Sequence, residues 1–358
     1  MRQLKEIDWA GIMLYTSGLA VTLIGLTWGG TPAHPWKGAS VLAPVSVGTC
    51  TVLGFLFYNF KITSHPLFPP ELVLRFREFT VLMIIYFILG MIFYSMSALL
   101  PQGTLYMFTT DPVQIGIAEI PNGLGQAVGS CAIPLLAHKI GNVKAQVVIA
   151  LAIQATSIAF LALAVPDNKA VWMTLQFFSQ GSFHVVNALG YFIASLQVHE
   201  KDAGTAFGLL GTLRSAGGSF GNAIFGVLVR SVLNMKLRKG ITQAALSLDY
   251  PTGHLSELIS AVISHGTGTL GSFNSVPDIT PELETAASAA FKEAYASAYR
   301  VVFLATLLPG IIAVVCACLL RKCPIPSTQI VVRMEKRGHE ETSLNNHMII
   351  VSEPQNKI

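Results

Sequence analysis

Charged residues are scarce in this chain. Asp, Glu, Lys and Arg make up 12% of its 358 residues, whereas a soluble domain of average composition has about 25%. The formal net charge of +4 is not gathered into a basic stripe, and no aromatic motif for reading bases accompanies it. The composition therefore excludes both an ordinary soluble domain and a nucleic-acid-binding protein.

Cysteine is also rare, and none of the five cysteines lies in a segment that we expect outside the membrane, so no disulfide framework is predicted. No cluster of His, Asp or Cys has the spacing of a metal site or a nucleophilic centre. The stretch Gly217-Gly218-Ser219-Phe220-Gly221 matches a hydrolase nucleophile pattern, but it lies within an apolar helix instead of a strand-to-helix turn. We therefore expect no cofactor, no metal and no enzyme activity.

Long apolar runs take the place of charge. Hydrophobic residues make up 52% of the chain, and eight runs of about 20 residues or more are long enough to cross a bilayer as helices. The predicted spans are Trp9–Trp28, Ala39–Phe60, Phe79–Leu100, Val113–Leu136, Ala145–Val165, Ala170–Gln197, Ala203–Leu233 and Tyr299–Leu320. The expected fold class is all-α, a polytopic membrane helix bundle of about eight transmembrane helices.

The distribution of Lys and Arg predicts the orientation of these spans. With a cytoplasmic N-terminus, the inner segments hold most of the basic residues, and the short outer loops hold only Lys37 and Lys169. We therefore expect an integral protein, of the plasma membrane, with both termini cytoplasmic. Residues 234–298 are expected to form a long outer loop, in which a helix that starts after Thr280 runs toward the last span. The polar tail after Pro324 is expected to be disordered.

One apolar span carries a row of polar side chains. Their spacings of four, four, three and four residues place them within an arc of about 80° on a helix surface. Polar groups in hydrocarbon are costly unless they pair or face water. The row therefore predicts a helix face that lines a solute path. Its members are Gln176, Gln180, His184, Asn187 and Tyr191.

A second polar row, also within about 80°, lies in the fourth span. It consists of Glu119, Asn122, Gln126 and Ser130. Glu119 is a candidate proton carrier, and His184 is the alternative because histidine titrates near neutrality. Arg214, near the middle of the seventh span, is a candidate for holding a carboxylate or another anionic group. For each of them the alternative is an interhelical hydrogen bond that only holds the bundle together.

The order of polar and featureless spans repeats along the chain. The last six spans run polar, polar, featureless twice, as in a pair of three-helix repeats whose third helix lies at the periphery. The alternative is that the polar residues only join neighbouring helices. Small-residue motifs also predict close helix packing; these are Gly125-x-x-x-Gly129, Gly204-x-x-x-Gly208 and Gly217-x-x-x-Gly221.

Several short motifs follow one another along the chain. They are Asp8-Trp9-Ala10-Gly11 with Gly25-Leu26-Thr27-Trp28-Gly29-Gly30 and Pro69-Pro70-Glu71-Leu72, Leu100-Pro101-Gln102 through Gly116 to Pro121-x-Gly123-x-Gly125, Lys139-Ile140-Gly141-Asn142-Val143-Lys144, and Arg214-x-x-Gly217-Gly218-x-x-Gly221. Their order resembles the second part of a fungal major facilitator superfamily transporter of the 14-span drug-efflux type, closest to the trichothecene efflux pump group. The resemblance covers about residues 5 to 325. It departs from the family where the first six spans have no counterpart, and where Ala137 and His138 stand near the missing acidic residue of a loop motif.

The resemblance implies two linker transmembrane helices and a cytoplasmic loop in residues 1–78, a C-terminal six-helix bundle in 79–323, and a cytoplasmic tail in 324–358. It also implies proton-coupled efflux of a small apolar compound, such as a toxin or drug, across the lipid bilayer. Such a solute would suit the aromatic neighbours of the first polar row, namely Phe177, Phe178, Phe183 and Tyr191.

The resemblance further implies that one bundle is missing. Alternating access in this family needs two bundles that rock about a central site. We therefore expect the chain to be a truncated half or a gene-model fragment, or a half-transporter that pairs with a missing N-terminal bundle or a second copy. The alternative is a non-transporting membrane fragment or a regulatory partner of a full-length transporter.

Overall fold

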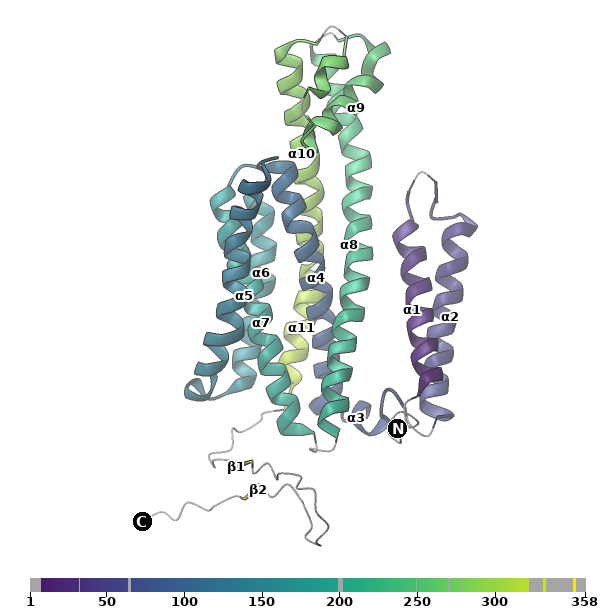
Figure 1. Ribbon diagram of the computed structural model, residues 1–358, viewed down its shortest axis with the longest axis vertical. Coiled ribbons are helices and arrows are strands. Elements are labelled where there is room, and N and C mark those ends of the chain that lie inside the picture. Colours follow the sequence, from purple (N-terminus) through teal and green to yellow (C-terminus); the bar gives the residue numbers. More distant parts are fainter. Residues whose placement is uncertain are drawn as a thin grey trace, which may run out of the picture.

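The protein is described here from a computed structural model (Figure 1). Side chains within residues 132–140 are not described, so the first two side chains of the predicted loop motif, Lys139 and Ile140, lie outside the described ones. The expected disordered tail lies almost wholly outside the described residues. The described ranges are 8–31, 33–63, 66–198, 202–248, 250–269, 271–277 and 279–321, with the two short strands β1 (Val331–Val332) and β2 (Ile350–Val351), which pair antiparallel.

Long helices account for most of the described chain, as the apolar runs predict. The long helices are α1 (Trp9–Trp28), α2 (Ala39–Lys61), α4 (Val81–Met107), α5 (Pro112–Ile140), α6 (Val143–Ala164), α7 (Lys169–Gln197), α8 (Ala203–Ser247), and α10 (Pro281–Ala305) continued by α11 (Leu307–Leu319). The short ones are α3 (Pro70–Val73), a π-helical turn (Phe76–Thr80), α9 (Leu255–Gly266), and two 3-10 turns (Thr252–His254 and Ser272–Ser275).

Six of the helical columns in the described residues are long and apolar enough to cross a membrane. They include α1, α2, α6, α8, α4 with its preceding π-helical turn, and α10 with α11. Helices α5 and α7 are not among the six, although each is 29 residues long. These two helices carry the polar rows predicted above, which lower their apolar content. The all-α membrane bundle is confirmed.

Two helix pairs form the body of the bundle. Helix α4 packs along α8, and α5 packs along α7, with α6 against α7 and α11 against both α6 and α4 (Figure 1). Both pairs approach through glycine. A Cβ atom on Gly217 of α8 would collide with the carbonyl oxygen of Phe87 in α4, and one on Gly125 of α5 with that of Phe177 in α7. Close packing is therefore confirmed for these two motifs, whereas a Cβ on Gly204 or Gly208 would meet nothing within 4 Å.

The two featureless helices lie next to each other. Helix α6 packs against both α10 and α11, and large aliphatic side chains point away from the bundle at this surface. Leu163 of α6 is 76% exposed and Leu308 of α11 is 70% exposed. Such exposure of leucine is stable when lipid replaces water, so this side of the bundle faces the acyl chains.

Helix α8 is too long for the bilayer. Its 45 residues span about 67 Å at 1.5 Å per residue, about twice the thickness of a hydrocarbon core. Its last part continues beyond the other helices, together with α9 and the first part of α10 (Figure 1). The last predicted span, Tyr299–Leu320, is therefore the second half of a longer column. That column starts at Pro281, where the hydroxyl of Thr280 accepts a hydrogen bond from the backbone N–H of Leu283 at 3.2 Å.

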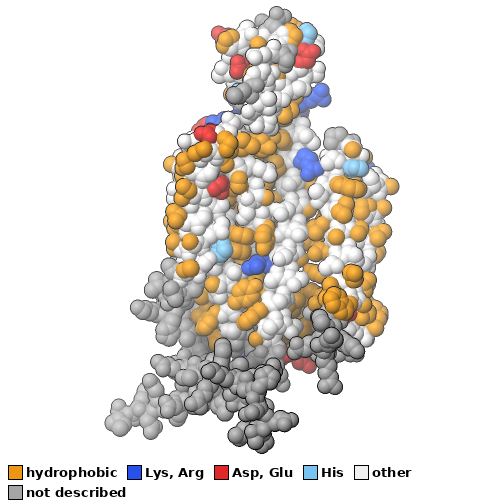
Figure 2. Space-filling model, in the orientation of Figure 1, with side chains coloured by type: hydrophobic (Ala, Val, Ile, Leu, Met, Phe, Trp, Pro, Cys, Tyr) orange, Lys and Arg blue, Asp and Glu red, His pale blue; other side chains and the backbone are white. Residues whose placement is uncertain are grey.

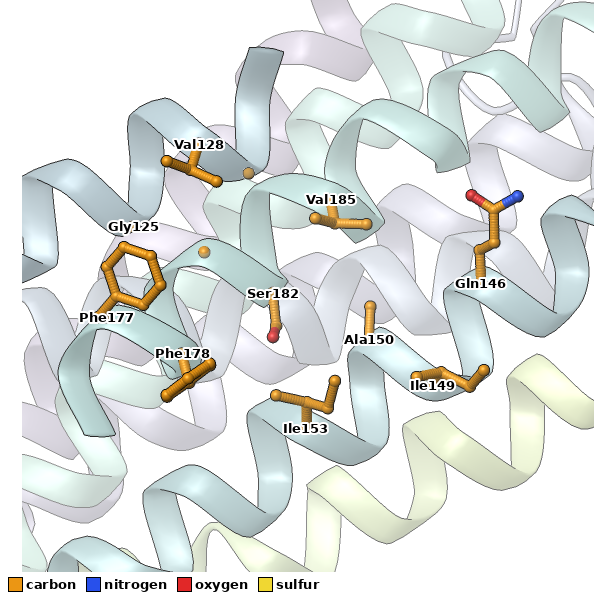
Figure 3. A pocket seen from close by; sticks show the side chains of 12 residues that line it. Gly125, Val128, Gln146, Ile149, Ala150, Ile153, Phe177, Phe178, Ser182 and Val185 are labelled. Atoms are coloured by element: carbon orange, nitrogen blue, oxygen red, sulfur yellow. The ribbon is translucent and has the colours of Figure 1, made fainter. Parts of the chain in front are cut away.

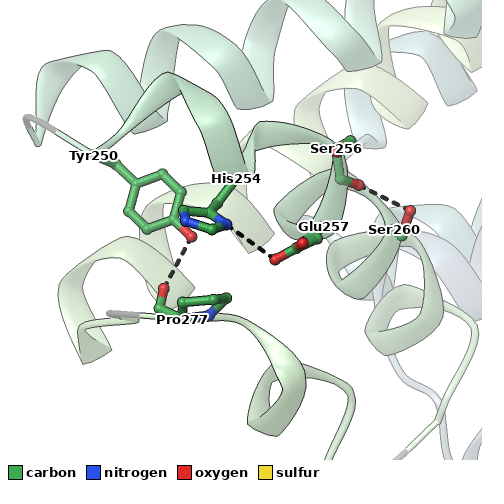
Figure 4. A network of polar contacts seen from close by, with 6 residues as sticks. All are labelled: Tyr250, His254, Ser256, Glu257, Ser260 and Pro277. Atoms are coloured by element: carbon green, nitrogen blue, oxygen red, sulfur yellow. Dashed lines mark hydrogen bonds and ion pairs between the residues drawn. The ribbon is translucent and has the colours of Figure 1, made fainter.

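The expected outer loop, residues 234–298, is mostly helical. It has a separate hydrophobic core, in which Ile241 of α8, Leu258 of α9 and Leu283 of α10 are each at most 2% exposed. The connecting turns are fastened by polar contacts, such as the Tyr250 hydroxyl donating to the carbonyl oxygen of Pro277 at 2.9 Å (Figure 4). Three helices that meet can each bury a narrow apolar stripe, so this segment forms a small packed unit although it lies beyond the bundle.

The connection from α2 to α4 is fixed by one buried side chain. Asn59, 1% exposed, donates to the carbonyl oxygen of Phe68 and accepts from the Phe68 N–H, both at 2.9 Å. This pairing holds the Phe68 ring edge-on to Phe55 and to Tyr15, at centroid distances of 5.6 and 5.7 Å. The hydrogen bonds thereby anchor the chain against α1 and α2 before it enters α4.

We expect Asn59→Ala to lower the free energy of unfolding by about 3 kcal/mol, because it leaves both backbone groups of Phe68 buried and unpaired. The measurement is thermal unfolding of the detergent-solubilised chain. Asn234→Ala is the matched control, since Asn234 is exposed on α8 and alanine favours the helix there. Equal unfolding temperatures for Asn59→Ala and the control would contradict the role assigned to Asn59.

Candidate functional site

Three helices from the two packed pairs meet at Asn187. Its backbone carbonyl accepts a hydrogen bond from the Tyr86 hydroxyl of α4, and its side-chain oxygen accepts one from Nη1 of Arg214 in α8, each at 2.6 Å. Helix α7 has far smaller interfaces with α4 and α8 than with α5 and α6. Asn187 is therefore a polar link across a thin seam, and we call Tyr86, Asn187 and Arg214 the seam junction.

Arg214 lies at mid-depth in the membrane. It comes eleven residues after Ala203, the first residue of α8, which corresponds to about 17 Å along the helix, and the hydrocarbon core is about 30 Å thick. Its side chain is partly buried, its Nε has no hydrogen-bond partner among the described residues, and no ion pair to it occurs there. A guanidinium at this depth that pairs only with a neutral amide is stable when water or an anion reaches it.

His184 lies one turn from the seam junction. Its ring meets Phe183 and Phe93 edge-on, at centroid distances of 4.9 and 5.6 Å. Phe93 of α4 in turn stacks on Phe183 at 3.7 Å. The His184 Nε2 atom is buried and has no hydrogen-bond partner in the described part of the chain. Two phenylalanine rings thus pack edge-on against a histidine that leaves one ring nitrogen unused within the described residues.

The polar row of α5 forms a ladder along its own helix. The Asn122 amide donates to a Glu119 carboxylate oxygen at 2.9 Å, and the Gln126 amide donates to the Asn122 oxygen at 2.8 Å. Asn122 is buried, whereas Glu119 and Gln126 are partly exposed. The ladder satisfies these polar groups in sequence and holds the carboxylate near one end of α5. No ion pair joins Glu119 to Arg214 among the described residues.

The polar row of α7 divides into two parts. Gln176 and Gln180 are 0% and 1% exposed and lie within the packed helices. His184, Asn187 and Tyr191 are partly exposed. The first two amides therefore do not line an open path in this conformation, and the second part of the row is the one that borders the seam.

The structure adds two aromatic residues of α4 that were not among the predicted site residues. Tyr86 reaches Asn187, and its ring meets the Tyr191 ring edge-on at 5.2 Å. Phe93 covers His184. The two are seven residues apart, so they lie on one face of α4. That spacing was a usable signal, but an aromatic face on an apolar helix is more often ordinary core.

An apolar cavity of about 390 Å³ lies on another side of α7 (Figure 3). Its walls come from α5, α6 and α7, and Phe177 and Phe178 line it together with Ile149 and Ile153 of α6. Phe183, by contrast, is 2% exposed and forms part of the core. The aromatic residues expected to receive an apolar solute are therefore separated: only Tyr191 borders the seam junction.

The surface of the bundle agrees with a membrane environment. On the face shown in Figure 2, hydrophobic side chains cover the bundle and charged side chains are sparse. Within the described residues, no group of three His, Cys, Asp or Glu side chains is placed to hold a metal ion. A polar seam at mid-depth of an otherwise apolar bundle is typical of helical transport proteins.

Comparison with known sequences agrees with this class. The model of the family described as fungal trichothecene efflux pump (TRI12) matches residues 1–334. The chain belongs to this family of transporters. Its sequence is 23% identical to the trichothecene efflux pump TRI12 of Fusarium sporotrichioides over 323 residues, which are 89% of the chain and 54% of that protein.

Other relatives cover the same part. The MFS-type transporter prx5 of Penicillium rubens is 26% identical over 88% of the chain and 57% of its own length. The chain thus spans about half the length of these curated relatives. Among solved structures, an inward-facing bacterial homologue of the human lysosomal transporter Spinster matches with a TM-score of 0.49 and 12% identity, over 87% of the chain and 66% of that protein.

Proposed function

We propose that this chain supplies one half of an efflux transporter and that the seam junction forms part of the wall of its solute path. The observation that carries the proposal is the guanidinium of Arg214 at mid-depth, bonded to a neutral amide and without an ion-pair partner in the described residues. Such a group is costly in lipid and useful beside a wet cavity. Family membership supports the same conclusion.

The proposed cargo is a small, mostly apolar compound, and the proposed driving ion is the proton. The named relatives include trichothecene efflux pumps. The partly exposed rings of Phe93 and Tyr191 give the seam an aromatic lining, with the buried Tyr86 ring packed behind Tyr191. Glu119 and His184 are the candidate proton carriers. The missing wall would come from an N-terminal bundle or a second copy, in the plasma membrane, with both termini cytoplasmic. We propose transport in preference to catalysis.

Efflux is tested by co-expressing the chain with the part of the Fusarium sporotrichioides relative that the chain does not match, in yeast that lacks its own drug pumps. We expect the pair, and neither half alone, to lower retention of a lipophilic fluorescent dye and of a trichothecene. Glu119→Gln and His184→Ala should each slow proton-driven efflux at least tenfold if the residue carries the proton. Membrane abundance of each variant is measured in the same cells.

Two controls match these variants. Glu282→Gln changes an exposed carboxylate at the start of α10, and His254→Ala changes an exposed histidine paired with Glu257 beyond the bundle. Both are expected to retain efflux. Full efflux by Glu119→Gln and by His184→Ala would refute the proton assignments. If the two halves are abundant and co-localised but the cells still retain the dye and the trichothecene in full, the alternative is favoured, namely a non-transporting regulatory partner.

A further inference from the structure

A polar cavity lies at the end of the bundle where α4 and α6 begin and α11 ends. It has a volume of about 690 Å³, and we call it the basic pocket. Three segments distant in sequence form it: the π-helical turn before α4, the first turn of α6, and the residues after α11. Its lining consists of Arg75, Phe76, Arg77, Glu78, Lys144, Leu320 and Arg321.

Positive charge dominates the basic pocket. Its lining holds four cationic side chains and one carboxylate, Glu78, which forms an ion pair with Arg321. The other three cations bond to neutral carbonyl oxygens: Arg77 to Leu319 at 3.3 Å, Lys144 to Cys318 at 2.6 Å, and Arg75 to Gln197 at 3.4 Å. These contacts position the cations without neutralising them.

Donors remain on these side chains. An arginine has five N–H donors and a lysine has three, and each of these three side chains uses one donor in its bond to a carbonyl oxygen. The N-terminus of α6, which is the positive end of its helix dipole, also lies at this end of the bundle. The pocket is therefore built for an anion with several oxygens.

Apolar groups border the same pocket. Phe76, in its lining, is 56% exposed, and the neighbouring Leu74 is 81% exposed. All three contributing helices begin or end here, which places the pocket where hydrocarbon meets the headgroup layer. It also lies at the ends of α6 and α11, two helices that expose large apolar side chains. A freely soluble anion would not need the apolar border, whereas a phospholipid would.

We propose that the basic pocket binds the phosphate of an anionic phospholipid in the leaflet nearest the N-terminus. The phosphate oxygens accept hydrogen bonds from Arg77, Lys144 and Arg75. The acyl chains lie along the exposed apolar side chains of α11 nearest the pocket, Val315 and Leu319. The lipid would hold α4, α6 and α11 together at this end of the bundle. The site requires no solute, no proton and no second bundle.

The test is native mass spectrometry of the full chain in detergent, titrated with phosphatidylserine and with phosphatidylcholine. Phosphatidylserine is expected to bind in preference. Each basic residue near an anionic membrane surface contributes about a fivefold gain in affinity, so the double variant Arg77→Gln with Lys144→Gln should bind phosphatidylserine about 25-fold more weakly. Lys61→Gln is the matched control, because Lys61 is an exposed cation at the same end, on α2 and outside the pocket.

Three results would overturn the proposal. One is unchanged phosphatidylserine binding by the double variant. Another is an equal loss for Lys61→Gln, which would indicate attraction to the whole surface. The third is equal competition by inorganic phosphate or glycerophosphoserine, which would identify a site for free anions. If the double variant unfolds when phosphatidylcholine is the only lipid present, the single variant Arg75→Gln is tested in its place. It is expected to bind phosphatidylserine about fivefold more weakly.

Discussion

Gly217→Ala is expected to push α4 away from α8 and to lower the free energy of unfolding by about 3 kcal/mol. The added Cβ would collide with the carbonyl oxygen of Phe87, a backbone atom that moves only with its helix. Overpacking of this kind costs about 1–3 kcal/mol, and a backbone partner places this case at the upper end. Thermal unfolding in detergent, followed by size-exclusion chromatography of the soluble fraction, measures the loss.

Gly208→Ala in the same helix is the control, with the opposite sign expected. A Cβ at Gly208 would meet nothing within 4 Å, and alanine is favoured over glycine in a helix by about 1 kcal/mol. This variant should unfold at the same temperature as the parent chain or above it. If Gly217→Ala were as stable as the parent chain, α4 and α8 could separate at this point with little loss in the free energy of unfolding. The close approach would then not contribute to stability.

A close approach of two helices at glycine residues occurs twice in the bundle. Gly217 and Gly221 of α8 approach α4, where Gly90 lies against the backbone of Arg214. Gly125 and Gly129 of α5 approach α7, where Gly181 lies against them. The two triplets are α4, α5 and α6, and then α7, α8 and the α10–α11 column. The second helix of each triplet packs on the first helix of the other: α8 on α4, and α5 on α7. This exchange is what two three-helix repeats produce, and it agrees with the repeated polar, polar, featureless order predicted from the sequence.

The membrane helices were predictable because length and hydropathy determine them almost alone. The small domain beyond the bundle was not. Lys236, Arg238 and Lys239 lie in the continuation of α8, and their charges end an apolar run although they do not end the helix. A single sequence shows where a helix leaves hydrocarbon, but the burial of Ile241 and Leu258 depends on three segments that meet only in the fold.

The candidate site was predictable in part for a similar reason. Helical spacing placed His184, Asn187 and Tyr191 on one face of α7, and the structure brings this face to the seam. Spacing alone did not distinguish them from Gln176 and Gln180, which are buried. The difference depends on the neighbouring helices: α5 covers one end of the row closely through glycine, while α4 and α8 leave the other end thinly covered.

The cross-helix partners were not predictable either. Whether Arg214 pairs with a carboxylate or with an amide depends on the relative heights of α5, α7 and α8. Loop lengths do not determine those heights to within one helical turn. The structure pairs Arg214 with Asn187 and leaves Glu119 in the ladder of α5.

Arg214→Ala is expected to abolish efflux by the co-expressed pair while leaving the chain in the membrane. The change removes the guanidinium that lies at mid-depth and the 2.6 Å hydrogen bond to Asn187, so the proposed path loses its positive charge and its link between α7 and α8. Dye and trichothecene retention in the yeast described above measure the effect. Arg230→Ala is the matched control, since Arg230 is on the same helix but donates to Thr27 of α1 at 3.2 Å.

Arg214→Lys and Asn187→Ala separate charge from geometry. Lysine keeps the charge but not the planar fork of donors, so efflux that survives in Arg214→Lys indicates that charge alone is required. If the hydrogen bond positions the guanidinium, Asn187→Ala should impair efflux, and adding it to Arg214→Ala should cost nothing more. Full efflux by Arg214→Ala at normal abundance would instead indicate that the seam junction only holds the helices together and that the solute path lies elsewhere in the bundle.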